Sequence, residues 1–370
     1  MEILEFDAAA RDEWDAFVRQ HPLAGFGHLA ANFDLAAATP GLRNVSLLAR
    51  EGRGIVAVLP LFEQEARVLR GIPLRSVVSG AFFPAGPLIS PEARGKGAGN
   101  ILGALLDRVR ERAAAARADN VVIAYPNVTA GQPTIARLGY SPLLHHGYHA
   151  RPGVGLLLDL SQSAEQLAAG RNSGCRQRIN KAQASGATVT RITAREEWAP
   201  AYALNVQTLG PLALSREQFD VIWDRFIAAD DAAAYAVHVD GKLAAMTATI
   251  RVNDVAYYWH GWRAADAIPG GAHLALWSAI LEAREHGCKA FELGSLEFVN
   301  AKNIGISQFK QSFGGVPFQT LAAELRLRPL KHAAIALAEA AAGAIRERKG
   351  RKAEAVAPAP APITAAVART

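Results

Sequence analysis

The sequence has few of the residues that build cross-links and metal sites. Only two of its 370 residues are cysteine, Cys175 and Cys288. They have no metal-ligand spacing, and two thiols exclude a disulfide framework. Neither lies in a motif typical of a thiol nucleophile. His145 and His149 are four residues apart, but Gly147 interrupts the helix that would align them and no carboxylate accompanies them. We therefore expect no metal.

Long apolar runs are also missing. No uninterrupted apolar run reaches the length that a membrane-spanning helix needs, so we expect no integral membrane segment. The first residues, "MEILEFDAAARDEW", are acidic and lack the apolar core of a secretory signal. The sequence therefore predicts a cytoplasmic protein.

The composition is that of a globular chain. Half of the residues are hydrophobic and 20% are charged, and a length of 370 residues indicates two domains. The net charge of +6 suits an anionic ligand such as a phosphate, a nucleotide, an RNA or an anionic membrane surface. A solubilising, arginine-rich surface explains the same excess, so charge alone selects no partner.

The order of predicted elements repeats. Two β-rich runs around a glycine turn occupy 45–67, and a second hairpin region with an Asp-Gly turn occupies 233–262. Each is followed by a long predicted helix, at 100–118 and 272–286, and then by a strand, "NVVIAYP" or "KAFELGS". We interpret this as an internal duplication of an α/β (α+β) unit with a mixed sheet flanked by helices.

The duplication predicts the domain boundaries. We expect one domain over 1–150 and a second over 151–330. An alanine-rich terminal helix is predicted over 331–349, with basic residues at its carboxyl end. The last residues, 350–370, are rich in alanine and proline and predict a disordered tail.

Two stretches can open a helix onto an anion. In "PEARGKGAGN" (91–100), glycines allow close approach of the backbone, and free N–H groups at a helix start attract negative charge. In "AADAIPGGAHLALW" (264–277), Pro269 and two glycines again precede a helix. An ordinary glycine-rich helix start is the alternative interpretation of both.

A basic segment begins the second half. No Asp or Glu lies between Glu165 and Glu196, whereas the interval contains six cations. At helical spacing Arg171, Arg178 and Lys181 share one face, with Arg176 beside it. This pattern predicts either a solvated basic face or a ridge that binds phosphate groups of a tRNA acceptor arm, a nucleotide-sugar or coenzyme A.

The repeated unit resembles the GNAT acyltransferase fold. The tandem arrangement is similar to the Fem-type peptidoglycan aminoacyl transferases and the BioF2-like (acetyltransferase-6) proteins. Three stretches support the resemblance: "LAAGRNSGCRQRINKAQASGATV", "VDGKLAAMTATIRVNDVAYYWHGW" and "AFELGSLEFVNAKNIGISQFKQSFGG". The resemblance covers most of residues 1–330 and is more specific in the second half than in the first.

The resemblance implies roles for particular residues. Arg94, Gly97 and Gly99 fit the R-x-x-G-x-G spacing with which GNAT enzymes hold the pyrophosphate of acyl-CoA. Phe309 and Lys310 match the Fem-type Phe-Lys pair, which implies that Lys310 stabilises an oxyanion. A surface lysine on a short helix is the alternative interpretation of Lys310.

Polar residues around the last predicted strand are further candidates. Glu292 ends this strand, where a carboxylate can orient or deprotonate an amine; a salt-bridged or capping carboxylate is equally expected. Ser295 and Asn303 are candidate polar lining, with Phe309 beside the substrate. The aromatic run "YYWHGW" (257–262) is more typical of core and edge packing than of a ligand wall.

These candidates predict an N-acyltransferase in which an amine attacks the donor carbonyl directly. Lys310 and Glu292 are the predicted catalytic residues, and Arg176 and Arg178 the predicted phosphate contacts. Acyl-CoA is the preferred donor, without a metal, and the acceptor is a small-molecule, nucleotide-linked or cell-envelope amine of the amino-sugar or peptidoglycan type. Aminoacyl-tRNA is the alternative donor. A non-catalytic protein that binds an anionic glycan or RNA is the alternative from another class.

Overall fold

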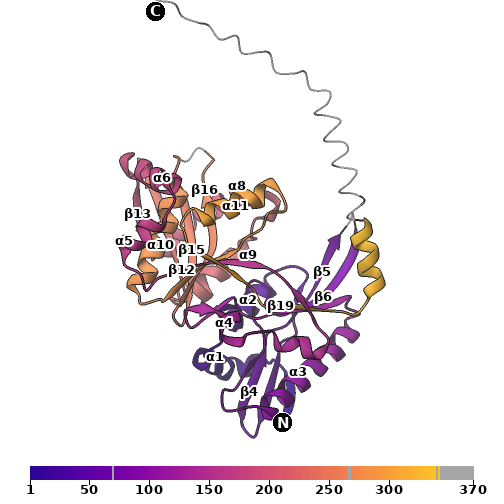
Figure 1. Ribbon diagram of the computed structural model, residues 1–370. Helices are drawn as coiled ribbons and strands as arrows, with labels where there is room; N and C mark the ends of the chain where they lie inside the picture. Colours follow the sequence, from indigo (N-terminus) through magenta and orange to yellow (C-terminus); the bar gives the residue numbers. More distant parts are fainter. Residues whose placement is uncertain (69–70, 266–267, 339–340, 342–370) are drawn as a thin grey trace, which may run out of the picture.

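The computed structural model describes the chain except for residues 69–70, 266–267, 339–340 and 342–370 (Figure 1). Residues 329–338 are helical, within and just before the predicted terminal helix. The predicted tail over 350–370 lies outside the described residues. The rest of the predicted helix also lies outside them, apart from residue 341. Among the described helices, none combines the length and apolar character needed to cross a bilayer.

The first half is a mixed α/β unit with two main sheets, ordered β1-β3-β4-β7 and β11-β19-β8-β6-β5-β2. Its elements up to residue 151 are β1 (Glu2–Glu5), α1 (Arg11–Gln20), α2 (Ala31–Ala37), β2 (Leu42–Asn44), β3 (Leu47–Glu51), β4 (Gly54–Leu59), β5 (Phe62–Val68), β6 (Ile72–Val78), β7 (Leu88–Ile89), α3 (Lys96–Ala115), β8 (Asn120–Ala124), β9 (Val128–Thr129), β10 (Gln132–Pro133), α4 (Thr134–Leu138) and β11 (His149–Arg151).

The second half is built on one seven-stranded sheet, ordered β13-β14-β15-β16-β17-β12-β18. Its elements, with the last strand of the chain, are β12 (Val154–Asp159), α5 (Ala164–Gly170), α6 (Ser173–Ala184), β13 (Thr188–Arg191), α7 (Arg195–Trp198), α8 (Ala201–Leu209), α9 (Arg216–Ile222), β14 (Ala232–Val239), β15 (Lys242–Val252), β16 (Val255–Arg263), α10 (Gly271–Glu285), β17 (Ala290–Ser295), α11 (Ala301–Gln311), β18 (Val316–Gln319) and β19 (Ala322–Arg326).

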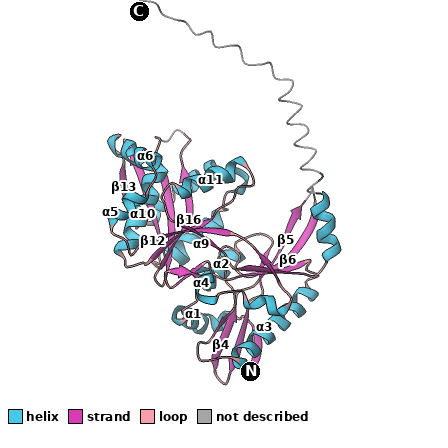
Figure 2. Ribbon diagram, viewed as in Figure 1, coloured by secondary structure: helices cyan, strands magenta, loops and turns pink. Residues whose placement is uncertain are grey.

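The predicted duplication and the α/β fold class are confirmed. In the first half α3 connects the parallel strands β6 and β8, and in the second half α10 connects the parallel strands β16 and β17. The predicted Asp-Gly hairpin turn joins β14 to β15, with positive φ at both Asp240 (49°) and Gly241 (74°). Those signs are the ones that a tight two-residue turn requires. Helix α10 packs on β14, β15 and α6, on one face of the sheet (Figure 2).

One late strand of the chain joins the sheet of the first half. Strand β19 lies within the range predicted for the second domain, yet it pairs with β8 and β11 in the sheet of the first half (Figure 1). The chain thus passes between the halves twice, once at 152–153 and again at 320–321. The two passages lie side by side, since the backbone N–H of Thr320 donates to the carbonyl of Gly153 at 3.0 Å.

A continuous apolar core also crosses between the halves. Phe26 of the first half lies with its ring centroid 5.1 Å from that of Phe226 and 5.5 Å from that of Trp259, both in the second half. Trp14 and Trp198 belong to the same buried cluster. Because burying such surface is the main source of stability, the halves fix each other's positions.

Candidate active site

The site begins where two parallel strands separate. Strands β16 and β17 pair only from Val255–Ala290 to Tyr257–Glu292. Both strands then continue, β16 to Arg263 and β17 to Ser295. The pairing of β16 with β15 shifts register beside Trp259, which makes a bulge there. The separation and the bulge open space on both sides of β16, and Tyr258 lines the pocket on each side.

The first of these pockets, here called the interdomain pocket, lies between the halves. It has a volume of about 590 Å³. The first half supplies Phe82, Phe83 and Asn127, and the second half supplies Trp259 and Glu292, among others. Among the described residues that line it, Glu292 is the only carboxylate and none is Lys or Arg. The pocket therefore offers a negative or neutral wall to a ligand.

The second pocket, here called the α10 pocket, has the opposite charge. It has a volume of about 690 Å³ and lies beside the start of α10. Arg178, Arg263 and Lys302 line it, and none of its described lining residues is Asp or Glu. The first N–H groups of α10 lack partners within the helix, so they add a positive dipole end. This combination suits a ligand that carries phosphate groups.

Gly270 fixes the start of α10 against α6. Its φ is +104°, and a Cβ added there would lie 2.0 Å from the carbonyl oxygen of Arg178. No side chain fits at that distance, so glycine is required for the close approach. His273 follows on the first turn, is buried, and places Nε2 3.4 Å from Nη1 of Arg178. Burial, with Arg178 adding to it, lowers the pKa of His273 to about 4, so the imidazole is neutral near pH 7.

Glu292 is a buried carboxyl that faces the interdomain pocket. Its side chain accepts a hydrogen bond at Oε1 from Nδ2 of Asn127, at 2.5 Å. Burial raises the pKa of Glu292 to about 7, and the Asn127 hydrogen bond and the Lys310 charge partly oppose that rise. A carboxyl with a pKa close to the working pH exchanges protons readily in both directions. The role of Glu292 as a base stays a prediction.

Lys310 lies on α11, close to the end of β17. Its Nζ donates to the carbonyl oxygen of Ser295 at 2.8 Å. Burial lowers the pKa of Lys310, and the charges of Glu292 and Glu297 oppose that change. Gly294 has φ +79°, and a Cβ there would lie 3.2 Å from Nζ. Glu292 and Lys310, the two predicted catalytic residues, therefore lie close enough for their charges to interact, although Lys310 lines neither pocket.

The other predicted lining residues divide between the pockets. Phe309 lines the α10 pocket, with its ring centroid 4.7 Å from that of His273. Ser295 lines the interdomain pocket. Asn303 lines neither, because its Nδ2 donates to Oε2 of Glu297 at 2.6 Å. Asn303 thus ties the loop after β17 to α11.

The basic segment forms two helices and not one continuous helix. α5 ends at Gly170, and Asn172 caps α6 by accepting from the N–H of Cys175 at 2.8 Å. The expected shared face of Arg171 with Arg178 is therefore wrong, because Arg171 precedes the new helix and stacks on the ring of Trp277, 4.0 Å from its centroid. Arg178 lines the α10 pocket, whereas Arg176 is exposed on α6 and donates to the carbonyl of Arg171.

The predicted pyrophosphate loop of the first half is exposed. Arg94, Gly97 and Gly99 line none of the three pockets described here. The N–H groups of Gly97 and Gly99 donate to the carbonyls of Arg94 and Gly95 at 3.1 Å, within the start of α3. These amides are already engaged, so the grip of this stretch on a donor stays a prediction.

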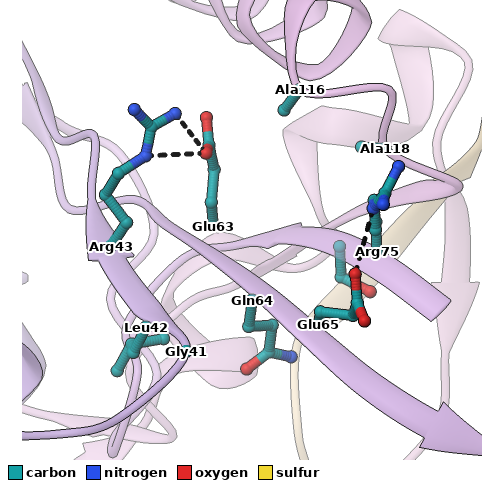
Figure 3. Close-up of a pocket in the computed structure, with 10 residues that line it drawn as sticks. Gly41, Leu42, Arg43, Glu63, Gln64, Glu65, Arg75, Ala116 and Ala118 are labelled. Carbon is teal, nitrogen blue, oxygen red and sulfur yellow. Dashed lines mark hydrogen bonds and ion pairs between the residues drawn. The ribbon is translucent and has the colours of Figure 1, made fainter. Parts of the chain in front are cut away.

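A third pocket lies on the first half between β2, β5, β6 and the end of α3. Figure 3 shows that its charged side chains face one another: Arg43 pairs with Glu63, and Arg75 pairs with Glu65 at 3.1 Å. Each cation already has a carboxylate partner, so this pocket leaves little charge for a ligand. Among its described residues it lacks a carboxylate without an ion-pair partner, such as Glu292 near the β16–β17 separation.

Several residues of the site were not predicted from the sequence. Asn127 follows β8, and nothing in its neighbourhood in the sequence indicates a partner in the other half. Tyr258, Trp259 and His260 were expected to serve packing, yet all three line the interdomain pocket. His273 could have been predicted from the sequence, because a histidine on the first turn of a helix that follows "PGG" lies where an anion would approach the helix.

Comparison with known proteins finds one domain match and several shared folds. Residues 169–311 match the family model described as an acetyltransferase (GNAT) domain. The structure of FemX superposes with a TM-score of 0.64 at 16% sequence identity, covering 90% of this chain and all (100%) of FemX. L-PGS from Bacillus licheniformis gives a TM-score of 0.53 at 14% identity, covering 88% of this chain and 94% of that one. None of the curated proteins compared matches the chain.

A third structure, the C-terminal domain of a putative lysylphosphatidylglycerol synthetase from Agrobacterium fabrum, superposes with a TM-score of 0.51 at 16% identity, covering 86% of this chain and 92% of that one. At such identities the likeness to solved structures shows a shared fold. Residues 169–311 thus match an acetyltransferase (GNAT) domain, and the chain as a whole shares its fold with FemX. Its architecture is the tandem, Fem-type arrangement found in FemX.

Proposed function

We propose that the protein is an N-acyltransferase that moves an acyl group from acyl-CoA to an amine of a small molecule or cell-envelope precursor. The observation that supports this most directly is the contrast between two pockets that meet at Tyr258. The α10 pocket is lined by cations without a carboxylate, and the interdomain pocket has a carboxylate without a lining cation. An anionic donor and an amine acceptor would be sorted to opposite sides of β16.

The donor would bind in the α10 pocket. Arg178, Arg263 and Lys302 would neutralise its phosphate groups, and the N–H groups at the start of α10 would bind one of them. The acyl end would then pass between the separated strands β16 and β17 toward Tyr258. Placing both reactants in adjoining pockets removes much of the entropic part of the barrier.

Glu292 and Lys310 would perform the chemistry. Glu292 accepts the proton that the amine loses as its nitrogen attacks the donor carbonyl. Lys310 has three N–H donors and uses one of them on the Ser295 carbonyl, which leaves two for the developing oxyanion. The carbon–sulfur bond then breaks, and the thiolate takes up the proton that Glu292 accepted, which regenerates the base and balances the reaction without a covalent enzyme intermediate.

Aminoacyl-tRNA is a second candidate donor, and the outer surface of α6 favours it. Arg176 and Lys181 are exposed on this helix, beyond the lining of the α10 pocket. A long polyanion would contact them, whereas a single coenzyme A molecule in the pocket would not need them. FemX and L-PGS have the same fold, which is consistent with this alternative without selecting it.

Direct binding measurements separate the two donors. We would titrate the protein with acetyl-CoA, longer acyl-CoAs and charged tRNA by calorimetry, and repeat each titration with Arg178→Gln, Arg176→Gln and Gly97→Glu. Binding of an acyl-CoA that weakens in Arg178→Gln and persists in the other two variants supports the α10 pocket. Tight, strongly salt-dependent binding of charged tRNA, weakened by both arginine variants, with no binding of CoA, would contradict the proposed donor.

A further inference from the structure

The interdomain pocket has walls that are mainly aromatic and apolar. Phe82 and Phe83 enter from the loop after β6, and Tyr258 and Trp259 from β16. The ring centroids of Phe83 and Trp259 are 6.4 Å apart, with their planes at 61°. All four side chains are only partly buried in this structure, so their surfaces are open to a ligand. A volume of about 590 Å³ fits a compact molecule.

The charges that face this pocket would reject an anion. Glu292 is its carboxylate, and burial lowers the pKa of His260 to about 4, so that its imidazole is neutral near pH 7. Tyr257, behind Glu292, is uncharged because burial raises its pKa well above the usual range. Lys310 lies outside the lining of this pocket and donates to the Ser295 carbonyl. A phosphate in the pocket would lose its hydration without gaining a lining cation.

The same features favour an ammonium group. Glu292 uses Oε1 to accept from Asn127, and its Oε2 accepts no hydrogen bond from the described part of the chain. The faces of aromatic rings also attract cations. An amine held beside Glu292 as its ammonium form would lose one proton to solvent, and Glu292 would accept the second proton as the nitrogen attacks the carbonyl at the strand separation.

We propose that the acceptor is a primary amine on an aromatic or apolar body that has neither phosphate nor carboxylate groups. This inference rests on the proposed function, because it assigns the acceptor side of the same site. It departs from a phosphorylated amino-sugar or nucleotide-linked precursor, whose anionic groups belong to the chemistry of the α10 pocket and not to that of the interdomain pocket.

Calorimetric binding of matched amines tests this without a known donor. We would titrate the full chain with phenethylamine, tryptamine, phenylalanine and glucosamine 6-phosphate, with and without saturating CoA. Phenethylamine and tryptamine should bind, whereas phenylalanine and glucosamine 6-phosphate should bind at least about tenfold more weakly. That ratio corresponds to the 1.4 kcal/mol that separates tenfold differences in affinity. Phenethyl alcohol, which lacks the amine, reports the contribution of the aromatic body alone.

Variants locate the binding. Trp259→Ala should weaken both aromatic amines about tenfold. Glu292→Gln should weaken phenethylamine and leave phenethyl alcohol unchanged. Glu65→Gln is the matched control, since Glu65 lies in the first-half pocket of Figure 3 and should change neither. Equal or tighter binding of glucosamine 6-phosphate, or no binding of either aromatic amine, would overturn the acceptor class. Binding of acyl-CoA, measured separately, would leave the proposed function standing in that case.

Discussion

Asn127 of the first half donates a hydrogen bond to the carboxylate of Glu292 in the second half, over 2.5 Å. The proposed base is therefore held partly by a domain whose described residues contribute no charged group to the interdomain pocket. The hydrogen bond stabilises the ionised carboxylate, which burial disfavours. The first half thus lowers the pKa of Glu292 besides forming one wall of the pocket.

Removing Asn127 should shift the pH dependence of catalysis. In Asn127→Ala the pKa of Glu292 rises, because an interaction that favours the charged form is lost. The acidic limb of the kcat/KM profile should move upward by about one pH unit, the effect expected of a hydrogen bond to a charged group. Activity should recover at higher pH.

Asn120 provides the control for that shift. It donates to Glu324 at 2.6 Å in a buried Asn–Glu pair of the same kind, away from both site pockets. Asn120→Ala should lower thermal stability and leave the pH profile where it is. A profile that moves equally in both variants would show that Asn127 acts only through the fold.

Replacing Glu292 by Gln should separate catalysis from stability. We expect a loss of about 10²- to 10⁴-fold in kcat, the usual contribution of general base catalysis. The pKa of Glu292 is raised to about 7 on folding. Its stabilising contribution is thus fully present below the unfolded value near 4.5 and is lost as pH rises through about 7. Glu292→Gln should therefore gain stability relative to the parent between pH 5 and pH 8 (about 2 kcal/mol), measured by denaturant unfolding. An unchanged difference between these pH values would argue against a buried, titrating carboxyl.

Lys310→Ala should lower kcat about a hundredfold while donor binding changes little, because the ammonium stabilises charge that develops in the transition state. Steady-state kinetics and calorimetry on the same variant make the comparison. Lys289→Ala is the control, since this exposed lysine pairs with Asp254 at 3.1 Å away from both site pockets. An equal loss in both variants, or a loss confined to KM, would contradict the oxyanion role.

Gly270→Ala should weaken donor binding by displacing the start of α10 from α6. The new Cβ would lie 2.0 Å from the Arg178 carbonyl, at a φ of +104°. We expect a stability loss of about 2 kcal/mol or more and a raised KM for the donor. Gly241→Ala is matched in having a positive φ (+74°) with no atom within 4 Å, so it should show only a loss of about 1 kcal/mol. If neither variant changed the KM for the donor, the α10 pocket would be excluded as the donor site.

The parts of this site that could be predicted from the sequence are those that depend on local pattern. Hydrophobic periodicity and turn residues revealed the repeated order of hairpin, helix and strand. The resemblance of "AFELGS" and "SQFKQ" to Fem-type sequences singled out Glu292 and Lys310, which the structure brings together. Both residues lie on elements whose ends are marked by glycine or a capping residue.

The remaining features depend on how distant segments meet. The aromatic strand was expected to serve packing because alternation describes which faces its side chains occupy. Alternation does not show that β16 stops pairing with β17 after Tyr257, or that β16 bulges at Trp259. Arg171 was placed on the wrong helix because the Asn172 cap interrupts an otherwise continuous basic pattern. Asn127 acquires its role only when the halves dock.

The exchange of β19 has a consequence for how this protein is made. Asn120 on β8 and its partner Glu324 on β19 are separated by 204 residues. As the chain leaves the ribosome, the edge of β8 that pairs with β19 stays unpaired until almost the whole second half has been synthesised. Unpaired strand edges are prone to aggregate. The first half produced alone should therefore be an aggregation-prone fragment, and adding a peptide that spans β19 should restore its solubility.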